Sequence, residues 1–380
     1  MSSDTLEVLA PGMLTTVQDL GRTSYQRFGV PQSGALDATA LRVANILLGN
    51  REGAAGLEIT ANGPRFRFLA DTVIAVTGAN LGATLDGQPL PGWQSFLASN
   101  GSVLDFEGPN DGLRSYVAFA GGIDVPLVMG SRSTYLRGGF GGFEGRALMA
   151  GDILKTFSPE VALALEGNGL PDDLAPESVG HDHEIRVVLG PQEEAFSSDG
   201  VSAFLSSGYT VAQDSDRMGY RLEGPSIEHV GAADIVSDAT ALGSVQVPGA
   251  GHPIILLADR GTTGGYAKIA TLVSPDISLL AQATPGDTVR FKAVSVAESH
   301  EILAEQESMI ADVKRSVALD RSGLFQLFAD GEARQVVSET GHPVTRRRAL
   351  TDGGTVESRT LSTSDGGFEF EFEVEVRHNE

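Results

Sequence analysis

The segment SVQVPGAGHPIILLADRGTTGGYAKIATL, residues 244–272, sets short apolar runs between turns rich in glycine, threonine and arginine. Its two longer apolar runs, Pro253–Ala258 and Ala267–Val273, have the length of strands and are bounded by turn residues. Upstream, residues 213–220 read QDSDRMGY, which adds further charged and polar groups. A purely structural strand-and-turn unit has little need for so many donors beside so much backbone freedom. The two segments therefore predict a β fold that carries a functional site.

The same alternation of short apolar runs and turn residues continues along the chain and predicts a mainly β protein with few helices. Two stretches have helical periodicity instead: Asp37–Leu48, which ends at Gly49-Asn50, and Ser295–Ser316. The other expected strands are Arg65–Leu69, Thr72–Thr77, Ala83–Leu85, Val103–Phe106, Arg114–Ala120, Ile185–Leu189, Ser244–Val247 and Thr288–Ala293.

Two pairs of short sequences favour a tandem duplication. Gly63-Pro64-Arg65-Phe66 resembles Gly224-Pro225-Ser226-Ile227, and Gly151-Asp152-Ile153 resembles Gly286-Asp287-Thr288, each Gly-Asp turn entering a strand. Gly-Pro and Gly-Asp are common turn dipeptides, so chance explains either pair alone. Together they favour two similar barrels.

Changes in composition set the expected boundaries. The stretch between the barrels is acidic and contains proline, which is typical of a linker. Near the end, residues 366–376 (GGFEFEFEVEV) alternate apolar and acidic side chains and predict an exposed edge strand. We expect a first barrel domain (1–158), a linker (159–184), a second barrel domain (185–294), a surface helix (295–316) and a partly ordered C-terminal appendage (317–380).

Composition narrows the class of protein. The 380 residues contain no cysteine, which excludes disulfides, thiolate nucleophiles and cysteine-bound metal sites. The formal charge of −23 repels phosphate backbones and argues against a nucleic-acid partner. No long apolar run and no secretory signal are present, so we expect a cytoplasmic protein without a membrane partner. With only four lysines, the acidic chain fits the hypothesis of a surface adapted to a saline cytoplasm, which thermal melts in increasing KCl would test.

Several familiar catalytic motifs are missing. The chain has no G-x-x-x-x-G-K-[ST] loop, no G-x-G-x-x-G between a strand and a helix, no H-E-x-x-H and no G-x-S-x-G. His181-Asp182-His183 is the one short metal-like triplet, but it falls in the expected linker, where such residues are usually solvated. We therefore expect no metal site.

The second barrel holds the first group of candidate site residues. Thr262-Thr263-Gly264-Gly265 offers hydroxyl and backbone N–H donors for an oxyanion or phosphate, or is simply a tight turn. Lys268, which follows Tyr266, either holds a carboxylate or phosphate or is a solvated strand residue, and Arg260 either binds a carboxylate or pairs locally near Asp259.

Other polar residues of the second barrel have weaker assignments. Gln246 and His252 bracket a Pro-Gly turn, and His252 is either an acid–base group or, more commonly, a hydrogen-bonded loop residue. Asp216 and Arg217 belong to a cluster that is either part of the same pocket or only a capped turn.

The first barrel has its own glycine-rich candidate. Residues 130–143 read GSRSTYLRGGFGGF, which combines flexible backbone with Arg132 and Tyr135. This segment is either a long hairpin connection or, as loops of this size usually are, a functional loop.

Four ordered blocks of the chain resemble one known family. They are residues 11–50, from PGMLTTVQDLGR to ILLGN, residues 120–152, residues 213–225 (QDSDRMGYRLEGP) and residues 244–271. The chain is thereby identified as similar to the allophanate hydrolase subunit 2 type, the biotin-dependent carboxyltransferase-like proteins that include the C-type subunit of 5-oxoprolinase. The resemblance covers about residues 5–295 and is less specific for substrate than for family.

The resemblance implies two tandem cyclophilin-like β-barrels that work with partner proteins. In the free-standing form, an allophanate hydrolase subunit 1 type protein, which is the B-type subunit of 5-oxoprolinase, and a third component, the A-type subunit, join it. Together they hydrolyse 5-oxoproline to glutamate with consumption of ATP. The chain has no carboxylase or biotin carrier part, so no biotin is expected on it. ATP is expected to be bound by the complex, and this chain by itself need not bind it.

For such a reaction, the resemblance places Arg260, Thr262, Thr263, Gly264 and Lys268 at a phosphate or carboxylate. It places Gln246, Asp216 and Arg217 at the substrate. Gly265, Tyr266, Arg132 and Tyr135 complete the expected binding residues.

Two rival functions stay open on the sequence alone. One is a regulatory binding protein that antagonises an inhibitor of a histidine kinase, and the other is the carboxyltransferase component of a biotin-dependent, urea carboxylase-like system. The genes adjacent to this one would discriminate between the three functions.

Overall fold

The computed structural model describes residues 2–157, 167–170, 174, 178–329, 344–349, 355–365 and 368–378. Contacts divide the chain into two units, Met1–Val317 and Ala318–Glu380. Among the described helices, none is long and apolar enough to cross a membrane. The first unit holds both β domains and is the part that bears on function.

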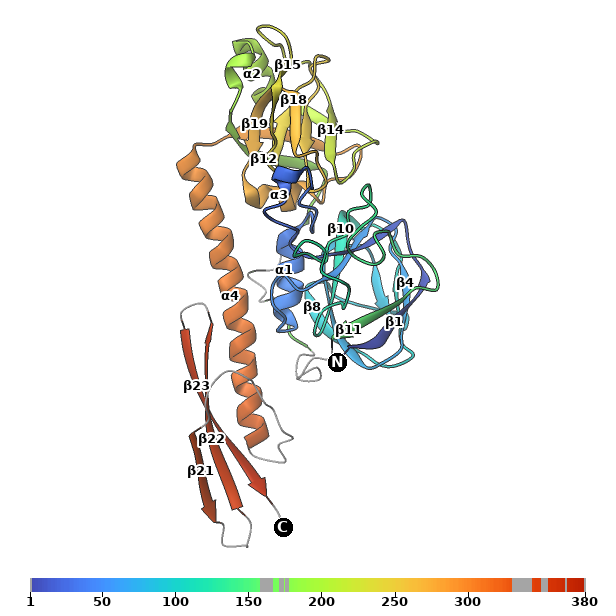
Figure 1. Cartoon of the computed structure of the whole chain (residues 1–380), viewed down its shortest axis with the longest axis vertical. Coiled ribbons are helices and arrows are strands. Elements are labelled where there is room, and N and C mark those ends of the chain that lie inside the picture. The colour runs from blue at the N-terminus through green and yellow to red at the C-terminus, as the bar shows by residue number, and fades with distance from the viewer. Residues whose placement is uncertain are drawn as a thin grey trace. The chain divides into compact units, whose positions relative to one another are not determined.

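The N-terminal half of the first unit consists of two sheets (Figure 1). The first has the order β11-β1-β4-β9-β6-β7 and the second the order β2-β3-β10-β5-β8, with antiparallel pairing throughout. The strands are β1 Ser2–Ala10, β2 Leu14–Gln18, β3 Gly56–Thr60, β4 Arg65–Phe68, β5 Thr72–Asn80, β6 Ala83–Leu85, β7 Gln88–Pro89, β8 Gln94–Ala98, β9 Val103–Phe106, β10 Asp111–Phe119 and β11 Ile153–Phe157.

These two sheets enclose one apolar core. β1 and β4 contribute Leu6 and Phe66 from one sheet, and β3 and β10 contribute Ile59 and Val117 from the other, all fully buried. β4 shows the pattern that produces this arrangement, because exposed and buried residues alternate along it as the pleat requires.

Helix α1 (Ala38–Leu47) covers the outer face of the five-stranded sheet, beside β8 and β10 (Figure 1). Asp37 caps its N-terminus by accepting a hydrogen bond from Ala40 N at 2.9 Å. The first turns of helix α4 (Val296–Ala329) pack Ile310 and Val313 into the same apolar cluster. This double cover explains why β5 is buried on both faces, with six consecutive buried residues from Thr72 to Thr77.

The C-terminal half of the first unit is a closed seven-stranded barrel of order β12-β19-β16-β17-β14-β13-β20. It closes through a parallel pair, β12 with β20, and its core includes Val187, Tyr209, Ile255 and Phe291. Its strands are β12 Asp182–Leu189, β13 Gly208–Val211, β14 Gly219–Glu223, β16 Ser244–Gln246, β17 Ile254–Leu256, β19 Lys268–Leu272 and β20 Thr288–Ala293.

Three smaller elements decorate this barrel. Helices α2 (Ser198–Ser206) and α3 (Ser274–Leu280) lie against it, and α3 also contacts α1. Strands β15 (Asp234–Ala239) and β18 (Thr263–Tyr266) pair only with each other and form a two-stranded ribbon that we call the flap. The flap is largely exposed, with Val236 at 93%.

One of the two repeated turns occupies the same place in both halves. Gly151 and Gly286 both have positive φ, 91° and 99°, and each precedes the last strand of its half. Asp152 accepts a hydrogen bond from Met149 N, and Asp287 accepts one from Thr284 N, each at 2.7 Å. This shared Gly-Asp turn supports the tandem duplication that the sequence suggests.

The other repeated sequence does not correspond. Arg65 and Phe66 begin β4, whereas Ser226 and Ile227 lie in the loop after β14. The resemblance between the two Gly-Pro tetrapeptides is therefore a coincidence of turn composition.

The expected secondary structure agrees well with the observed elements. The prediction of a mainly β chain is confirmed, and every expected strand overlaps an observed one. Asp182–Glu184, assigned to the linker by sequence, belong to β12 because they pair with residues 288–290 of β20. Much of the rest of the expected linker, residues 159–166, 171–173 and 175–177, lies outside the described residues.

The second unit contains a three-stranded antiparallel sheet, β21 (Val344–Ala349), β22 (Thr355–Asp365) and β23 (Phe368–His378). β23 pairs with β22 alone among the described strands, which confirms the edge strand predicted from the alternating sequence. Helix α4 extends to Ala329, beyond the expected end at Ser316.

Candidate functional site

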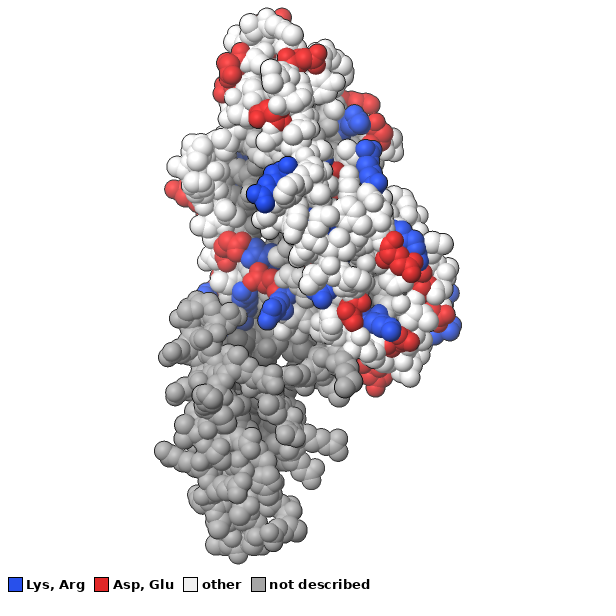
Figure 2. All heavy atoms as spheres, viewed as in Figure 1, with Lys and Arg blue, Asp and Glu red and all other residues white. Residues whose placement is uncertain are grey.

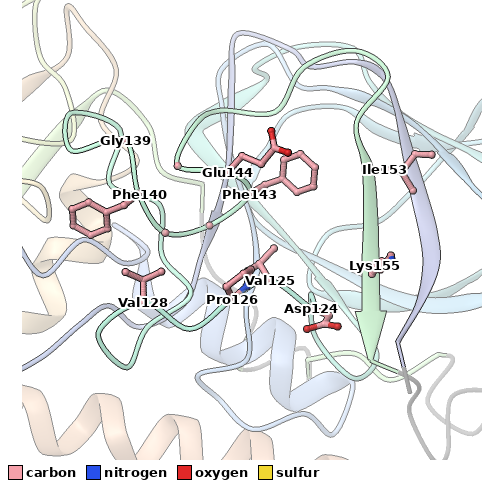
Figure 3. Close-up of a pocket in the computed structure, with 13 residues that line it drawn as sticks. Asp124, Val125, Pro126, Val128, Gly139, Phe140, Phe143, Glu144, Ile153 and Lys155 are labelled. Atoms are coloured by element: carbon pink, nitrogen blue, oxygen red, sulfur yellow. The ribbon is translucent and has the colours of Figure 1, made fainter.

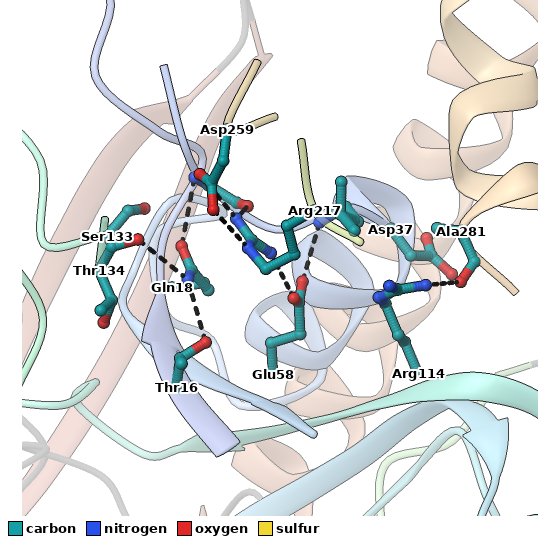
Figure 4. Close-up of polar contacts among 12 residues, drawn as sticks. Thr16, Gln18, Asp37, Glu58, Arg114, Ser133, Thr134, Arg217, Asp259 and Ala281 are labelled. Carbon is teal, nitrogen blue, oxygen red and sulfur yellow. Dashed lines mark hydrogen bonds and ion pairs between the residues drawn. The ribbon is translucent and has the colours of Figure 1, made fainter. Parts of the chain in front are cut away.

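The two β domains meet through charged side chains and one amide that are shielded from water. We call this group, Asp37, Glu58, Arg114, Arg217, Asp259 and Gln282, the junction cluster. Figure 4 labels its five charged members. Buried charges are retained only where they are paired or serve a ligand, so the partners of each one decide its role.

Arg217 is the centre of the junction cluster (Figure 4). It lies in the turn between β13 and β14, and its side chain is 5% exposed. Its guanidinium pairs with Glu58 from the first domain and with Asp259 of its own domain, whose Oδ2 lies 3.0 Å from Nε. Nη2 also donates to Gly34 O at 2.7 Å. Arg217 therefore joins the two domains with four hydrogen bonds from its five N–H donors.

Glu58 uses both carboxylate oxygens. Oε1 binds Arg217, while Oε2 accepts hydrogen bonds from Leu36 N at 2.9 Å and from the Tyr116 hydroxyl at 2.8 Å. Burial disfavours the charged form, but the positive charges of Arg217 and Arg114 outweigh it and hold the pKa of Glu58 below its ordinary value. Glu58 is therefore a carboxylate at neutral pH.

A second contact across the junction is made by Arg114 and Gln282. Arg114 Nη1 donates to the Tyr220 hydroxyl at 2.5 Å and to Ala281 O at 2.6 Å, while its Nε has no acceptor. Gln282 Nε2 donates to Asp37 Oδ2 at 2.7 Å, and its Oε1 accepts from Arg114 N at 2.9 Å. One glutamine thus links the capping residue of α1 to β10 across the two domains.

The segment after β2 brings a further arginine to the same region. The side chain of Asp19 is occupied by serine hydroxyls, with Ser131 Oγ at 2.7 Å and Ser133 Oγ at 2.5 Å. Arg22 is 1% exposed and donates one hydrogen bond, from Nη2 to Ser133 O. Among the described residues, its Nε and Nη1 have no acceptor and its Nη2 makes one hydrogen bond, so four of its five N–H donors are unsatisfied. Gln18 ties this segment to the loop by donating to Thr134 O at 3.3 Å and accepting from Gly34 N at 3.2 Å (Figure 4).

Arg22 is covered by the glycine-rich segment 138–145. The Phe140 ring lies over the guanidinium, with Cζ 5.0 Å from its centroid. Gly141 has φ of 73°, and a Cβ there would stand 2.8 Å from Arg22 Nη2. The close approach of backbone to guanidinium therefore requires glycine at this position.

The other side of the same segment lines a cavity of about 390 Å³ (Figure 3). Phe140, Gly141 and Phe143 contribute to its wall, together with Pro126 and Lys155. Ile153, which also lines the cavity, is 45% exposed. Leu127, which lies between the lining residues Pro126 and Val128 in the sequence, is 58% exposed. Of the residues assigned to the site by sequence, none is among those that line this cavity.

Arg260, like Arg22 and Arg114, is a buried arginine without a carboxylate partner among the described residues. It is 6% exposed, and its Nε and Nη1 donate to the carbonyl oxygens of Thr240 and Leu257, both at 3.2 Å. Burial lowers its pKa to about 10, so the side chain is still a cation at neutral pH. It follows Asp259 directly, which places it at the edge of the junction cluster.

The flap closes over the remaining candidates of the second domain. Lys268 Nζ pairs with Asp238 of β15 at 3.0 Å, and its own side chain is only 3% exposed. Gln246 Nε2 donates to Tyr266 O at 3.3 Å, and a Cβ on Gly264 would collide with that amide. Gly264 is therefore required for the flap to lie against β16.

The structure brings together part of the residues assigned from the sequence. Arg260, Gln246, Gly264, Tyr266 and Lys268 share the base of the flap. Thr262 holds that base by accepting a hydrogen bond from Thr240 N at 3.1 Å through its carbonyl oxygen. Thr263 is exposed on β18, and Gly265 lies beside it.

Other assigned residues lie elsewhere. Asp216 is exposed and caps its own turn, accepting from Met218 N at 2.7 Å. Arg132 lies in the first domain, where its Nε donates to Val125 O at 2.9 Å. The ring of Tyr135 packs edge-on against that of Phe140, with 5.5 Å between the ring centroids. Arg132 and Tyr135 thus flank Ser133 and border the Arg22 region, apart from the flap.

Sequence reasoning missed the residues that connect these parts, namely Gln18, Asp19, Arg22, Ser33, Glu58 and Arg114. A weak signal was available for Arg22 and Ser33, because a glycine stands on the outer side of each of them. Both of these glycines, Gly21 and Gly34, adopt positive φ. Each of these glycines packs its backbone against the other limb of the turn, where a Cβ would clash.

The triplet at 181–183 has a structural explanation. His181 Nδ1 and His183 Nε2 lie 2.7 and 3.2 Å from the two oxygens of Asp287, and Asp182 pairs with Arg290. Over the part of the chain that is described, no group of three or more potential metal ligands occurs.

Figure 2 shows acidic and basic side chains next to one another in several places on one face of the molecule.

Comparison with known families and proteins gives consistent matches. Residues 28–293 match the family described as carboxyltransferase domain, subdomain A and B. The chain is 38% identical to the 5-oxoprolinase C subunit of Escherichia coli (strain K12), over 80% of this chain and 95% of that protein. It is 35% identical to the 5-oxoprolinase C subunit of Haemophilus influenzae, over 82% of this chain and 98% of that protein.

A solved structure extends the similarity to longer enzymes. The Kluyveromyces lactis urea carboxylase matches 94% of this chain with a TM-score of 0.78 and 28% identity. The chain spans only 33% of that urea carboxylase, and it spans 55% of another matching solved chain that is 37% identical with a TM-score of 0.68.

Proposed function

The chain belongs to the carboxyltransferase domain family, subdomains A and B, and we propose that it is the C-type subunit of an ATP-dependent 5-oxoprolinase. The observation that carries this proposal is the extent of the match. The 5-oxoprolinase subunits correspond to this chain over 95–98% of their own length, whereas the urea amidolyase of Saccharomyces cerevisiae does so over 17%.

The proposed reaction opens a lactam ring with water to give glutamate, driven by ATP. This chain would contribute binding and charge stabilisation. Arg260 suits that role because it is a buried cation that, among the described residues, is bonded to two neutral carbonyls alone, so it has donors and charge left for an anion. Lys268 is the nearby second cation, held in place by Asp238.

The described residues offer a poor fit to ATP itself. The cavity of about 390 Å³ has Asp124 and Glu144 in its wall against the single cation Lys155, which opposes binding of a triphosphate. We therefore propose that ATP is held by the complex with its partners, the B-type and A-type subunits of 5-oxoprolinase. This chain would supply part of the acceptor site.

The test is reconstitution. The chain is co-expressed with the two partner subunits, and glutamate released from 5-oxoproline is measured with and without ATP. Arg260→Met is expected to lower turnover by on the order of 100-fold or more, because an electrostatic donor to a developing anion is lost. Lys268→Met is expected to lower it by roughly tenfold.

Matched controls separate this effect from a change in net charge. Arg290 and Lys292 lie on β20 of the same domain and are exposed, with side-chain exposures of 53% and 60%. Arg290→Met and Lys292→Met should leave turnover within about twofold. Turnover that survives Arg260→Met and Lys268→Met would overturn the site assignment while leaving the family intact.

One observation favours a second candidate function. The structural match to urea carboxylase covers more of this chain than the sequence matches do, 94% against 80–82%. A carboxyltransferase served by a separate biotin protein would consume bicarbonate and ATP with urea, and avidin would block it. If neither reaction occurs and the chain still binds its partner protein, the regulatory alternative is favoured.

A further inference from the structure

One buried arginine of the first domain, Arg22, has no role in the function proposed above. Its guanidinium is 1% exposed, yet Nε and Nη1 lack any acceptor, and the nearby Ser33 Oγ, also buried, lacks one too. Unsatisfied buried donors are rare in proteins, and each needs an explanation. Arg22 and Ser33 lie in two segments that are hydrogen-bonded to each other, because Arg22 N donates to Gln32 O at 2.8 Å.

The two carboxylates close to Arg22 do not neutralise it through a hydrogen bond. Asp19 accepts from Ser131 Oγ, Ser133 Oγ, Arg132 N and Gly21 N, all within 3.0 Å. Asp259 is bound by Arg217. Burial lowers the pKa of Arg22 below its ordinary value, and the charges of these two carboxylates only partly offset that effect. These two carboxylates therefore leave the free donors of the guanidinium unused, and an arginine guanidinium is not deprotonated in proteins.

Only a thin cover separates Arg22 from the cavity of about 390 Å³. Phe140 stacks on the guanidinium, Gly141 touches it, and both also line the cavity (Figure 3). The cover is rich in glycine, and Gly139, Gly141, Gly142 and Gly145 all have positive φ. A shift of segment 138–145 would join the free donors of Arg22 to the cavity.

We infer that Arg22 is a binding residue for a small carboxylate, which enters from the cavity when segment 138–145 moves aside. A planar guanidinium donates well to both carboxylates and phosphates. Asp19 and Asp259 distinguish the two, because a doubly charged phosphate is repelled more strongly by two nearby carboxylates than a singly charged carboxylate is. This inference rests on the proposed function in one respect: it assigns the carboxylate of 5-oxoproline to Arg22.

The experiment measures binding by calorimetry, first with the full chain and then with the reconstituted complex. The probes are L-5-oxoproline, 2-pyrrolidinone, which has the same lactam ring without the carboxylate, and inorganic phosphate. Arg22→Met is expected to weaken binding of 5-oxoproline by about 10- to 100-fold and to leave 2-pyrrolidinone unchanged. Arg22→Lys should restore part of the loss, and Arg67→Met, on the exposed surface of the same domain, should have no effect.

A second measurement does not depend on how the variants fold. In the wild-type protein, the NMR signal of Arg22 Nε–H, assigned by its absence in Arg22→Lys, should shift when 5-oxoproline is added and stay in place with 2-pyrrolidinone. The inference is overturned if neither the chain nor the complex binds 5-oxoproline more tightly than 2-pyrrolidinone. It is also overturned if phosphate binds more tightly than 5-oxoproline, or if Arg22→Met weakens both lactams equally.

Failure of this inference and failure of the proposed function have different signatures. Hydrolysis of 5-oxoproline that is insensitive to Arg22→Met removes the inference and keeps the function. Carboxylate binding that depends on Arg22, in a complex that does not hydrolyse 5-oxoproline, keeps the inference and removes the function.

Discussion

Arg217 and Arg22 are both buried where the two β domains meet, with exposures of 5% and 1%, but their surroundings are opposite. Arg217 pairs with two carboxylates and a carbonyl, and it joins residues 159 positions apart in the sequence. Arg22 makes one hydrogen bond, and most of its donors have no acceptor. Two arginines of similar burial can thus have different roles. Arg217 holds the two domains together, whereas Arg22 lowers the stability of the protein because most of its buried donors lack acceptors.

The largest expected effect on stability comes from replacing Arg217, the arginine of this comparison that pairs with two carboxylates. Arg217→Met leaves Glu58 and Asp259 buried without their cation, which should lower the free energy of unfolding by about 3–5 kcal/mol. Urea denaturation followed by circular dichroism measures it. The exposed neighbour Arg221, paired with Asp214, provides the control, and Arg221→Met should cost less than about 0.5 kcal/mol.

Equal stability losses for the two variants would show that the Arg217 pairs do not hold the domains together. The same result would remove the contrast with Arg22.

The pH dependence of stability should follow the same carboxylate. The pKa of Glu58 is lowered in the folded protein, so its contribution to stability is fully present above its ordinary value of 4.5. That contribution is lost as the pH falls through the folded pKa. Unfolding measured from about pH 6 down to about pH 3 should show this decline, and Glu58→Gln should flatten it. Identical slopes for wild type and Glu58→Gln would assign the acid sensitivity to other carboxyl groups.

Replacing Arg22, whose donors mostly lack acceptors, should not lower the stability of the protein in this way. Arg22→Met removes one hydrogen bond and a contact with Phe140, but it also removes four buried N–H donors that have no acceptor among the described residues. We expect the free energy of unfolding to stay within about 1 kcal/mol of wild type or to rise. Thermal denaturation of both proteins under the same conditions tests this, and a loss as large as that of Arg217→Met would mean that Arg22 is structural.

The smallest effect is expected from an ion pair in contact with water. Arg42 on α1 binds Glu307 on α4 at 2.6 Å, and the glutamate side chain is 49% exposed. Glu307→Gln should cost about 0.5 kcal/mol, and the cost should shrink at high salt because solvent and ions screen the pair. A cost as large as that of breaking the buried pairs, or one that is unchanged by salt, would contradict the distinction between exposed and buried charges.

Local sequence predicted the strands well because apolar alternation and turn residues are local properties. Val103–Phe106 and Thr288–Ala293 were predicted with the observed bounds, and α1 differs from its expected range by one residue at each end. The strands β1 and β3 were missed. β1 begins SSDT and β3 carries Glu58, so neither reads as an apolar run, and pairing with other strands makes them regular.

The site was harder to predict than the fold. The residues around the flap were identified because Arg260, Gly264 and Lys268 lie within one short segment. The function expected of Arg217 came from its place in a polar cluster, and nothing in the order of residues indicated that its guanidinium is occupied by Glu58. Asp216 was expected at the substrate, and the structure places it on an exposed turn.

By itself, the sequence determined the class of fold, the positions of about half of the strands, the repeated Gly-Asp turn and the family, since each depends on residue order over short distances. Only the tertiary structure decided which buried charges are satisfied. Arg22, Arg114, Arg217 and Arg260 are alike as letters, and their roles differ because acceptors supplied by distant segments reach some of their donors and leave others free.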